Sequence, residues 1–206
     1  MGDAVSPHDY AVRSSVEVYR GKLFALRRDE VSMPGGTTAV REVLVHPGAV
    51  VIAAVDEADR IVLVRQYRHP IRRYLWEIPA GLLDVDGEPP VDGARRELAE
   101  EAGLLARDWH ALLDLATSPG ISSETIRVFL ARGLSDVHEA DRYVPRGDEE
   151  VEMTVERIDL DEAVRRALAG ELENAATVAG VLAAARARDA GWQGLRPADA
   201  PWVGRR

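Results

Sequence analysis

The chain has 206 residues, of which 46% are hydrophobic and 30% charged, and it carries a formal net charge of -9 without any cysteine. Its length and composition predict a compact protein with one large or two small domains. The acidic balance argues against nucleic-acid binding, and the lack of cysteine excludes disulfides, thiolate nucleophiles and zinc-thiolate sites. No apolar run approaches the roughly 20 residues of a membrane span, and the N-terminus lacks a signal-peptide pattern. We therefore expect a cytoplasmic protein that does not enter a membrane.

The first segment, residues 1–46, predicts a small antiparallel sheet. Residues 22–26 and 39–44 alternate between apolar and polar side chains, and they flank a turn signal at residues 33–36. A sheet of this size buries little apolar surface alone. It is therefore expected to pack on the second domain, residues 47–206, or to form a dimer interface with another copy of the chain.

The second domain opens with two apolar runs. Residues 50–55 and 61–64 surround an acidic turn at residues 56–60, and this pattern predicts a second hairpin. The tail after Gly191 reads as irregular. Further elements are expected as strands near residues 109–115, 126–131 and 151–158 and as helices near residues 161–169 and 175–189. Strands mixed with helices predict an α+β fold, as an α-β-α sandwich preceded by the small N-terminal sheet.

The most informative run, residues 97–101, places three glutamates in five positions. Pro90 suits the first turn of a helix and Gly103 the position just past its end, and apolar residues recur between them every three or four positions. Glu97 and Glu101 are four residues apart, so both carboxylates leave one side of this helix, beside its apolar stripe. Like charges at this spacing repel each other unless a hard divalent cation lies between them.

Such a run is also typical of a solvated face, with Arg95 and Arg96 as ion-pair partners of the glutamates. The surrounding pattern favours metal ligands instead. From Gly81 through Glu88 to Leu104 the sequence resembles the Nudix box, a glycine, a glutamate and then Arg-Glu-aliphatic-x-Glu-Glu-x-Gly-aliphatic. Six residues separate Gly81 from Glu88, one more than in the usual box, which implies a longer loop before the helix.

Three further stretches, residues 76–81, 118–122 and 170–175, resemble the ADP-ribose pyrophosphatase branch of that family. Pro119 lies fifteen residues after Leu104, a spacing similar to that of the branch's marker for ADP-ribose, although a Pro-Gly pair alone indicates only a turn. The resemblance implies a homodimer that splits ADP-ribose into AMP and ribose 5-phosphate. The alternatives are a pyrophosphatase for another nucleoside diphosphate sugar and a catalytically silent module that senses ADP-ribose-like metabolites.

Cleavage of a diphosphate requires neutralised phosphate oxygens and an activated water, and carboxylate-bound Mg²⁺, or Mn²⁺ in its place, supplies both. Glu97 and Glu101 are the metal ligands that we expect first, and they thereby take part in catalysis. Glu100 is expected as an additional or bridging ligand, and the resemblance adds the backbone carbonyl of Ala80. Arg96 is expected to orient a neighbouring carboxylate rather than to contact substrate.

A general base must lie elsewhere if all of these carboxylates bind metal. The acidic segment 147–152 offers candidates, and the resemblance favours Glu150, on a loop that could close over the site. Glu149 and Glu152 are alternatives. The same four acids in this segment are also typical of a solvated surface loop.

Substrate contacts require positive charge and a flat apolar surface. Arg65 and Arg68 lie on an expected strand or at its end, where guanidinium groups could hold diphosphate oxygens, and the resemblance supports Arg41 of the N-terminal sheet. Glu77 could accept hydrogen bonds from the terminal ribose, or it could form an ion pair at a strand end. Adenine could stack on an aromatic side chain, for which the candidates are Phe24, Tyr67 and Trp76.

Overall fold

The computed structural model describes residues 10–141, 143 and 153–202. The chain divides into two compact units. The N-terminal unit comprises the described residues up to Pro47 together with Ala116–Glu124, and the larger unit comprises the other described residues. Residues 116–124 join the N-terminal unit, not the second domain as expected. The reason is that Leu44 donates its amide to Ile121 O at 2.8 Å and accepts the amide of Ser123 at 2.9 Å.

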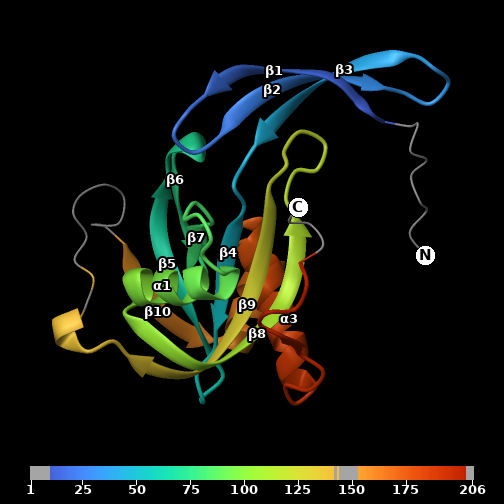
Figure 1. Cartoon of the computed structure of the whole chain (residues 1–206). Helices are drawn as coiled ribbons and strands as arrows, with labels where there is room; N and C mark the ends of the chain where they lie inside the picture. Colours follow the sequence, from blue (N-terminus) through green and yellow to red (C-terminus); the bar gives the residue numbers. More distant parts are fainter. Residues whose placement is uncertain (1–9, 142, 144–152, 203–206) are drawn as a thin grey trace. The chain divides into compact units, whose positions relative to one another are not determined.

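The N-terminal unit is an antiparallel sheet of β1 (Val12–Arg20), β2 (Ala25–Ser32) and β3 (Thr38–Val45), in that order (Figure 1). The expected turn at residues 33–36 is present, with the Met33 amide donating to Thr37 O at 2.8 Å. The expected strand at residues 22–26 is wrong, because residues 22–24 form the β1–β2 turn and β2 continues to Ser32. All of β1 is exposed, so no buried face imposes an apolar alternation that would reveal it.

The larger unit contains two sheets and three helices. One sheet has the order β11-β8-β9-β4-β7 and the other has the order β10-β5-β6. The bounds of the strands are β4 Ala49–Ala54, β5 Arg60–Arg68, β6 Arg73–Glu77, β7 Ala80–Leu82, β8 Leu104–Ala116, β9 Thr125–Asp136, β10 Thr154–Asp159 and β11 Arg196–Pro197. Those of the helices are α1 Pro90–Ala102, α2 Leu160–Leu168 and α3 Ala175–Asp189.

Strand β4, an interior strand of the five-stranded sheet, lies between the helices of an α-β-α sandwich, which confirms the expected fold. All six of its residues are buried, and successive side chains point to opposite faces of the sheet. Val50 and Ile52 belong to the apolar cluster that contains Leu98 of α1. Val51 and Ala53 belong to the second cluster, which contains buried residues of α2 and α3. Figure 1 shows α1 and α3 on opposite faces of the sheet.

The expected hairpin of residues 50–55 and 61–64 is present only at its tight turn, where Val55 and Ile61 form a single antiparallel bridge. Asp56 organises the turn, because its Oδ1 accepts the amides of Ala58 and Arg60 at 3.0 and 2.9 Å. Beyond the turn the strands separate into different sheets. Each strand has two hydrogen-bonding edges, and β9 and β7 occupy those of β4 while β10 and β6 occupy those of β5.

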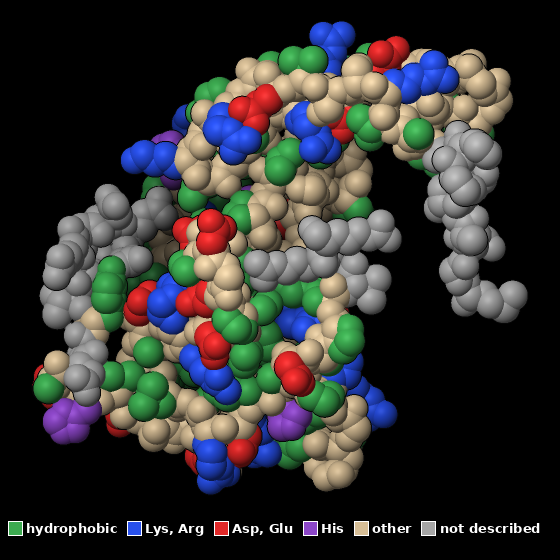
Figure 2. All heavy atoms as spheres, in the orientation of Figure 1, with side chains coloured by type: hydrophobic (Ala, Val, Ile, Leu, Met, Phe, Trp, Pro, Cys, Tyr) green, Lys and Arg blue, Asp and Glu red, His purple; other side chains and the backbone are tan. Residues whose placement is uncertain are grey.

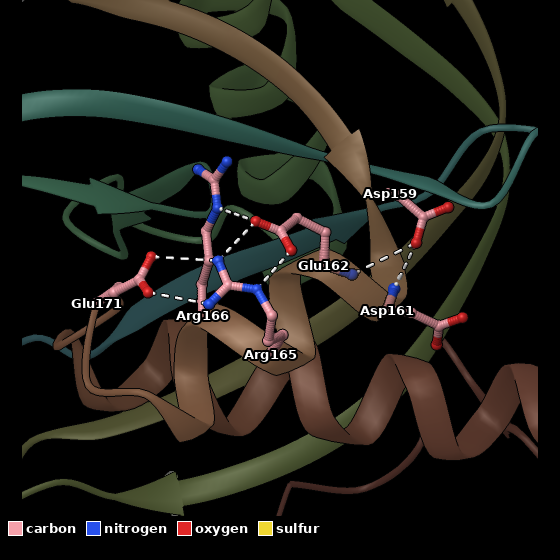
Figure 3. A network of polar contacts seen from close by, with 6 residues as sticks. All are labelled: Asp159, Asp161, Glu162, Arg165, Arg166 and Glu171. Atoms are coloured by element: carbon pink, nitrogen blue, oxygen red, sulfur yellow. Dashed lines mark hydrogen bonds and ion pairs between the residues drawn. The ribbon is translucent and has the colours of Figure 1, made fainter.

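The bounds of the three α-helices agree closely with those predicted from the sequence. Helix α1 ends at Gly103, whose φ of 65° places it in the left-handed region as predicted. Helix α2 begins after Asp159, which caps it by accepting the amides of Asp161 and Glu162, and arginine–glutamate pairs line its surface (Figure 3). Helix α3 begins after Asn174 in the same way. None of the helices in the described residues is long and apolar enough to cross a membrane.

The tail, expected to be irregular, is held to the sheet. Strand β11 pairs with β8, and the guanidinium of Arg127 on β9 is buried beneath the residues that follow β11. Arg127 donates to Asp114 at 2.7 Å and to the carbonyls of Ala200 and Pro201 at 2.6 and 3.1 Å. It also lies 4.9 Å from the ring centroid of Trp202. These partners are far from Arg127 in the sequence, so no local pattern reveals them.

Candidate active site

The glutamates of α1 lie at the boundary of the core. Ala94 and Leu98 are fully buried, and they form the apolar stripe that fixes the orientation of the helix. Glu97 lies beside this stripe with a side chain that is 14% exposed, and Glu100 is more accessible at 33%. Figure 2 shows basic and acidic side chains interspersed on the face of the molecule that carries α1. The helix thus presents its carboxylates as a half-buried group rather than a fully solvated face.

Gly81 of β7 passes directly over Glu97. A Cβ atom at this position would lie 2.0 Å from Cδ of Glu97 and 2.1 Å from its Oε1. Any other residue would therefore have to displace the carboxylate or the strand. Gly81 pairs with Val50 of β4, so the buried strand β4 holds β7 at this distance from α1. The glycine of the box therefore leaves room for the Glu97 carboxylate, which a side chain at residue 81 would push aside.

Glu101 is bonded to the same segment. The amide of Ala80 donates to Oε2 of Glu101 at 2.9 Å. Ala80 stands opposite Val51, while the neighbouring Ile52 donates its amide to Pro79 O at 2.8 Å. In an antiparallel ladder the N–H and C=O groups of one residue point to the same side, so the carbonyl of Ala80 also points away from β4. One short segment thus brings a carbonyl oxygen to the side that faces Glu101.

Arg96 links three of the carboxylates in this region to one another. Its Nη1 donates to Glu97 at 2.7 Å and to Glu100 at 3.3 Å, and Nε and Nη2 each reach Glu88 at 3.3 Å. This is the orienting role that the sequence suggested. Despite the longer loop, Glu88 reaches the helix. Arg95 instead bonds Asp92 at 2.6 Å and takes no part in holding these glutamates.

Burial disfavours negative charge on both central glutamates. It raises the pKa of Glu101 from 4.5 to about 8, and the negative charges of Glu97 and Glu77 add to the shift, while the Ala80 amide and Arg68 oppose it. Burial also raises the pKa of Glu97, and the ion pair with Arg96 only partly offsets it. The two carboxylates therefore lie where a cation would relieve their mutual repulsion.

A hard divalent cation fits this donor set, which consists of carboxylate oxygens and one backbone carbonyl oxygen. Within the described residues, no three His, Asp or Glu side chains are gathered closely enough to hold a metal ion by themselves. The Glu97 and Glu101 oxygens are engaged by Arg96 and by the Ala80 amide. Each carboxylate has a second oxygen, so a cation could bind while Arg96 and the Ala80 amide keep Glu97 and Glu101 in place.

Two of the expected substrate contacts bind each other. Arg68 donates from Nε and Nη2 to the two carboxylate oxygens of Glu77, at 3.0 and 2.6 Å, and Glu77 is only 2% exposed. Of the two alternatives for Glu77, the structure has the ion pair. Arg65 is exposed, with its guanidinium 4.5 Å from the ring centroid of Tyr74. Strand β6, which carries Glu77, was not expected from the sequence, so the pairing could not be foreseen.

The other expected contacts lie in the N-terminal unit. Arg41 of β3 is exposed and donates to Val40 O at 2.9 Å, and Phe24 is 41% exposed in the β1–β2 turn. Pro119 is exposed in the segment Ala116–Glu124. The structure thus bonds Glu101 to Ala80 and links Glu97 to Glu100 through Arg96. Phe24, Arg41 and Pro119 belong to the other unit. The base candidates Glu149, Glu150 and Glu152 lie outside the described residues.

Comparison with known proteins assigns both units of the chain. A model of the NUDIX domain matches residues 45–179, and a model of the nucleoside diphosphate sugar hydrolase N-terminal domain matches residues 11–44. The chain belongs to the Nudix family. Nudix hydrolases generally need divalent metal ions, which agrees with the buried carboxylates of α1.

Relatives of this Nudix hydrolase match most of its length. It is 48% identical over 201 residues to the ADP-ribose pyrophosphatase of Mycobacterium tuberculosis, which covers 98% of this chain and 95% of that protein. It is 36% identical to the ADP-ribose pyrophosphatase of Bacillus subtilis over 78% of this chain and 84% of that protein. A methanol dehydrogenase activator from Bacillus methanolicus is 38% identical over 72% of this chain and 78% of its own.

The fold also has a solved counterpart. The crystal structure of an ADP compounds hydrolase superposes with a TM-score of 0.75 at 24% sequence identity, covering 92% of this chain and 99% of that one. At this identity the likeness concerns the fold alone. The Nudix α-β-α sandwich with its additional N-terminal sheet is therefore an architecture found in other proteins.

Proposed function

We propose that this Nudix hydrolase cleaves the diphosphate of ADP-ribose into AMP and ribose 5-phosphate. The observation that carries the proposal is the pair Glu97 and Glu101, of which Glu97 lies against Gly81 and in which burial raises the pKa of both carboxyls. Such a pair suits a reaction in which cationic charge must be held against phosphate oxygens. The choice of ADP-ribose is supported by the name of the Mycobacterium tuberculosis relative, which matches nearly the whole chain.

Glu97, Glu101 and the carbonyl of Ala80 are proposed to hold Mg²⁺, or Mn²⁺ in its place, and Glu100 joins them on leaving Arg96. When bound, the ion neutralises phosphate oxygens and lowers the pKa of a bound water. Arg96 then keeps its bonds to Glu88 and holds the start of α1 in place. The close contact at Gly81 fixes the carboxylate of Glu97, so the ligands need little reorganisation.

Glu150 is proposed as the general base, with Glu149 and Glu152 as alternatives. The base removes a proton from water as its oxygen forms a bond to phosphorus, and the bond between that phosphorus and the bridging oxygen breaks. We propose that the positive charge that binds the diphosphate comes from Arg65, whose guanidinium is exposed, and from Arg41. We further propose that Phe24 and Pro119 contact the nucleoside, and that Glu77 contributes to substrate binding by orienting Arg68 for the diphosphate.

We propose a cytoplasmic homodimer built through the N-terminal sheet, without a nucleic-acid partner. Three valines of β1, Val12, Val16 and Val18, are 55%, 61% and 58% exposed, which is unusual for a strand unless another surface covers it. Light scattering at micromolar concentration measures the mass directly. A monodisperse monomer with full activity would contradict the dimer.

Another nucleoside diphosphate sugar is the second candidate substrate, because the model matching residues 11–44 describes hydrolases of that substrate class. The two candidates share the diphosphate chemistry and differ in the base and sugar that must be bound. A silent module that senses ADP-ribose remains a third outcome of the same experiment.

The test is the release of nucleoside monophosphate from ADP-ribose, GDP-mannose and UDP-glucose with Mg²⁺. We expect a clear preference for ADP-ribose, and we expect Glu97→Gln to lower kcat/KM by roughly a hundredfold or more because a charged ligand is lost. Glu156→Gln, an exposed glutamate of β10, is the matched control and should retain activity. Preference for another sugar would select the second candidate, and binding of ADP-ribose without cleavage would select the sensor.

A further inference from the structure

A four-residue segment, residues 77–80, connects β6 to β7 and is fixed along its length; we refer to it as the strap. At one end Glu77 is paired with Arg68, and at the other the Ala80 amide donates to Glu101. Between them the carbonyl of Pro79 accepts the amide of Ile52 at 2.8 Å. One backbone donor of the strap remains, the amide of Ile78, and its partner comes from a distant part of the chain.

That partner is the hydroxyl of Thr177 on α3. The amide of Ile78 donates to Oγ1 of Thr177 at 3.1 Å, across 99 residues of sequence. Thr177 is 1% exposed and Ile78 is fully buried. The orientation of Thr177 is itself set, since its amide donates to Oδ1 of the capping Asn174 at 2.9 Å. A buried amide has no water to replace a lost acceptor, so this hydroxyl determines where Ile78 lies.

Helix α3 also holds the side chain of Ile78. Gly180 lies three residues after Thr177, and a Cβ atom there would be 2.6 Å from Cδ1 of Ile78. The helix therefore positions Ile78 both through its amide and through its side chain. The proline ring at residue 79 locks one backbone dihedral of the strap, so a shift of Ile78 passes to Ala80 with little chance of being absorbed.

We propose that Thr177 is a positioning residue of the metal site. It fixes Ile78, and through the strap it fixes the amide of Ala80 that holds Glu101 and the carbonyl that we assign to the metal. This role rests on the proposed function only in so far as the protein binds a divalent cation at Glu97 and Glu101. Loss of the hydroxyl should displace a ligand that Thr177 does not contact, and such indirect changes typically cost about tenfold or more in metal affinity.

The experiment measures Mn²⁺ binding without substrate, by the electron paramagnetic resonance signal of the free ion, in the full-length protein. Thr177→Val removes the hydroxyl at nearly constant volume, and Thr177→Ser restores it. Asp159→Ala is the matched control, because it removes the helix cap of α2. The hydrogen bonds that hold the strap go to Arg68, Thr177, Ile52 and Glu101, which lie outside α2. Both Thr177→Val and Asp159→Ala should lower the midpoint of thermal unfolding, so lost stability alone cannot explain a difference in Mn²⁺ affinity between the two variants.

We expect the dissociation constant for Mn²⁺ to rise about tenfold in Thr177→Val and to stay within about twofold of wild type in Thr177→Ser and Asp159→Ala. Unchanged affinity in Thr177→Val would overturn the positioning role. If that variant does not fold, Thr177→Ala decides instead, because it also removes the hydroxyl that accepts the Ile78 amide, and wild-type affinity there would also overturn the proposal. Wild-type protein that binds no Mn²⁺ would overturn the metal site as well, whereas failure to cleave ADP-ribose would leave the role of Thr177 intact.

Discussion

Without bound metal, the free energy of unfolding of this protein should decrease as the pH rises, because Glu101 keeps a proton in the folded state. Burial raises the pKa of this carboxyl from 4.5 to about 8 in the folded protein. Between those values the folded state keeps a proton that the unfolded state releases. The free energy of unfolding therefore decreases with pH in this window, and the stabilisation present below about 4.5 is lost as the pH passes through about 8.

The slope follows from one proton. A difference of one bound proton changes the free energy of unfolding by about 1.4 kcal/mol per pH unit, so the step from pH 5.5 to pH 7.5 costs roughly 2 to 3 kcal/mol. That is a large part of the 5–15 kcal/mol typical of folded domains, so it lies well above measurement error. A divalent cation must displace the same proton, so its affinity should rise by up to about tenfold per pH unit below about 8.

Urea unfolding in EDTA, followed by tryptophan fluorescence at several pH values, measures this slope. Glu101→Gln removes the titrating group while keeping an oxygen that can accept the Ala80 amide, so this variant should lack that part of the slope. Glu156→Gln makes the same change at an exposed position of β10 and should follow the wild type. Parallel stability profiles for wild type and Glu101→Gln between about pH 5.5 and 7.5 would refute the reasoning.

Three further changes probe the rest of the site. Gly81→Ala places a Cβ 2.0 Å from Cδ of Glu97, so we expect a loss of about 1–3 kcal/mol in urea unfolding together with weaker Mn²⁺ binding; unchanged binding would contradict the close contact. Arg68→Ala leaves the buried carboxylate of Glu77 unpaired and should destabilise the fold by about 3 kcal/mol, an effect that Glu77→Gln in the same chain should largely relieve. Glu150→Gln should lower kcat by roughly a hundredfold with little change in KM, and a fully active variant would move the base to another residue.

The parts of the fold that the sequence predicted are those with local causes. Helix α1 was predictable because its proline, its terminal glycine and its apolar repeat all lie within the segment itself. The same is true of Glu97 and Glu101, whose spacing alone places them on one side of the helix. Arg96 could also be assigned its orienting role, since it is adjacent to the carboxylates that it bonds.

The parts that were missed depend on pairing between distant segments. A tight turn between apolar runs predicts a hairpin, yet β4 and β5 separate because other strands occupy their edges, which no window around residue 56 can reveal. The Arg68–Glu77 pair required strand β6, and the bond from Ile78 to Thr177 spans 99 residues. The resemblance at residues 170–175 marked the start of α3, but only the structure shows that Thr177 in its first turn accepts the amide of Ile78.

The hydrogen bonds from Arg127 to the tail limit how far the chain can be shortened. Its guanidinium is 2% exposed, and two of its acceptors are carbonyls of Ala200 and Pro201, so these residues complete the solvation of a buried cation. A protease that cut the chain before Ala200 would remove both carbonyl acceptors and leave that charge paired with Asp114. The tail is thus part of the folded core, and trimming it would destabilise the protein rather than yield a smaller enzyme.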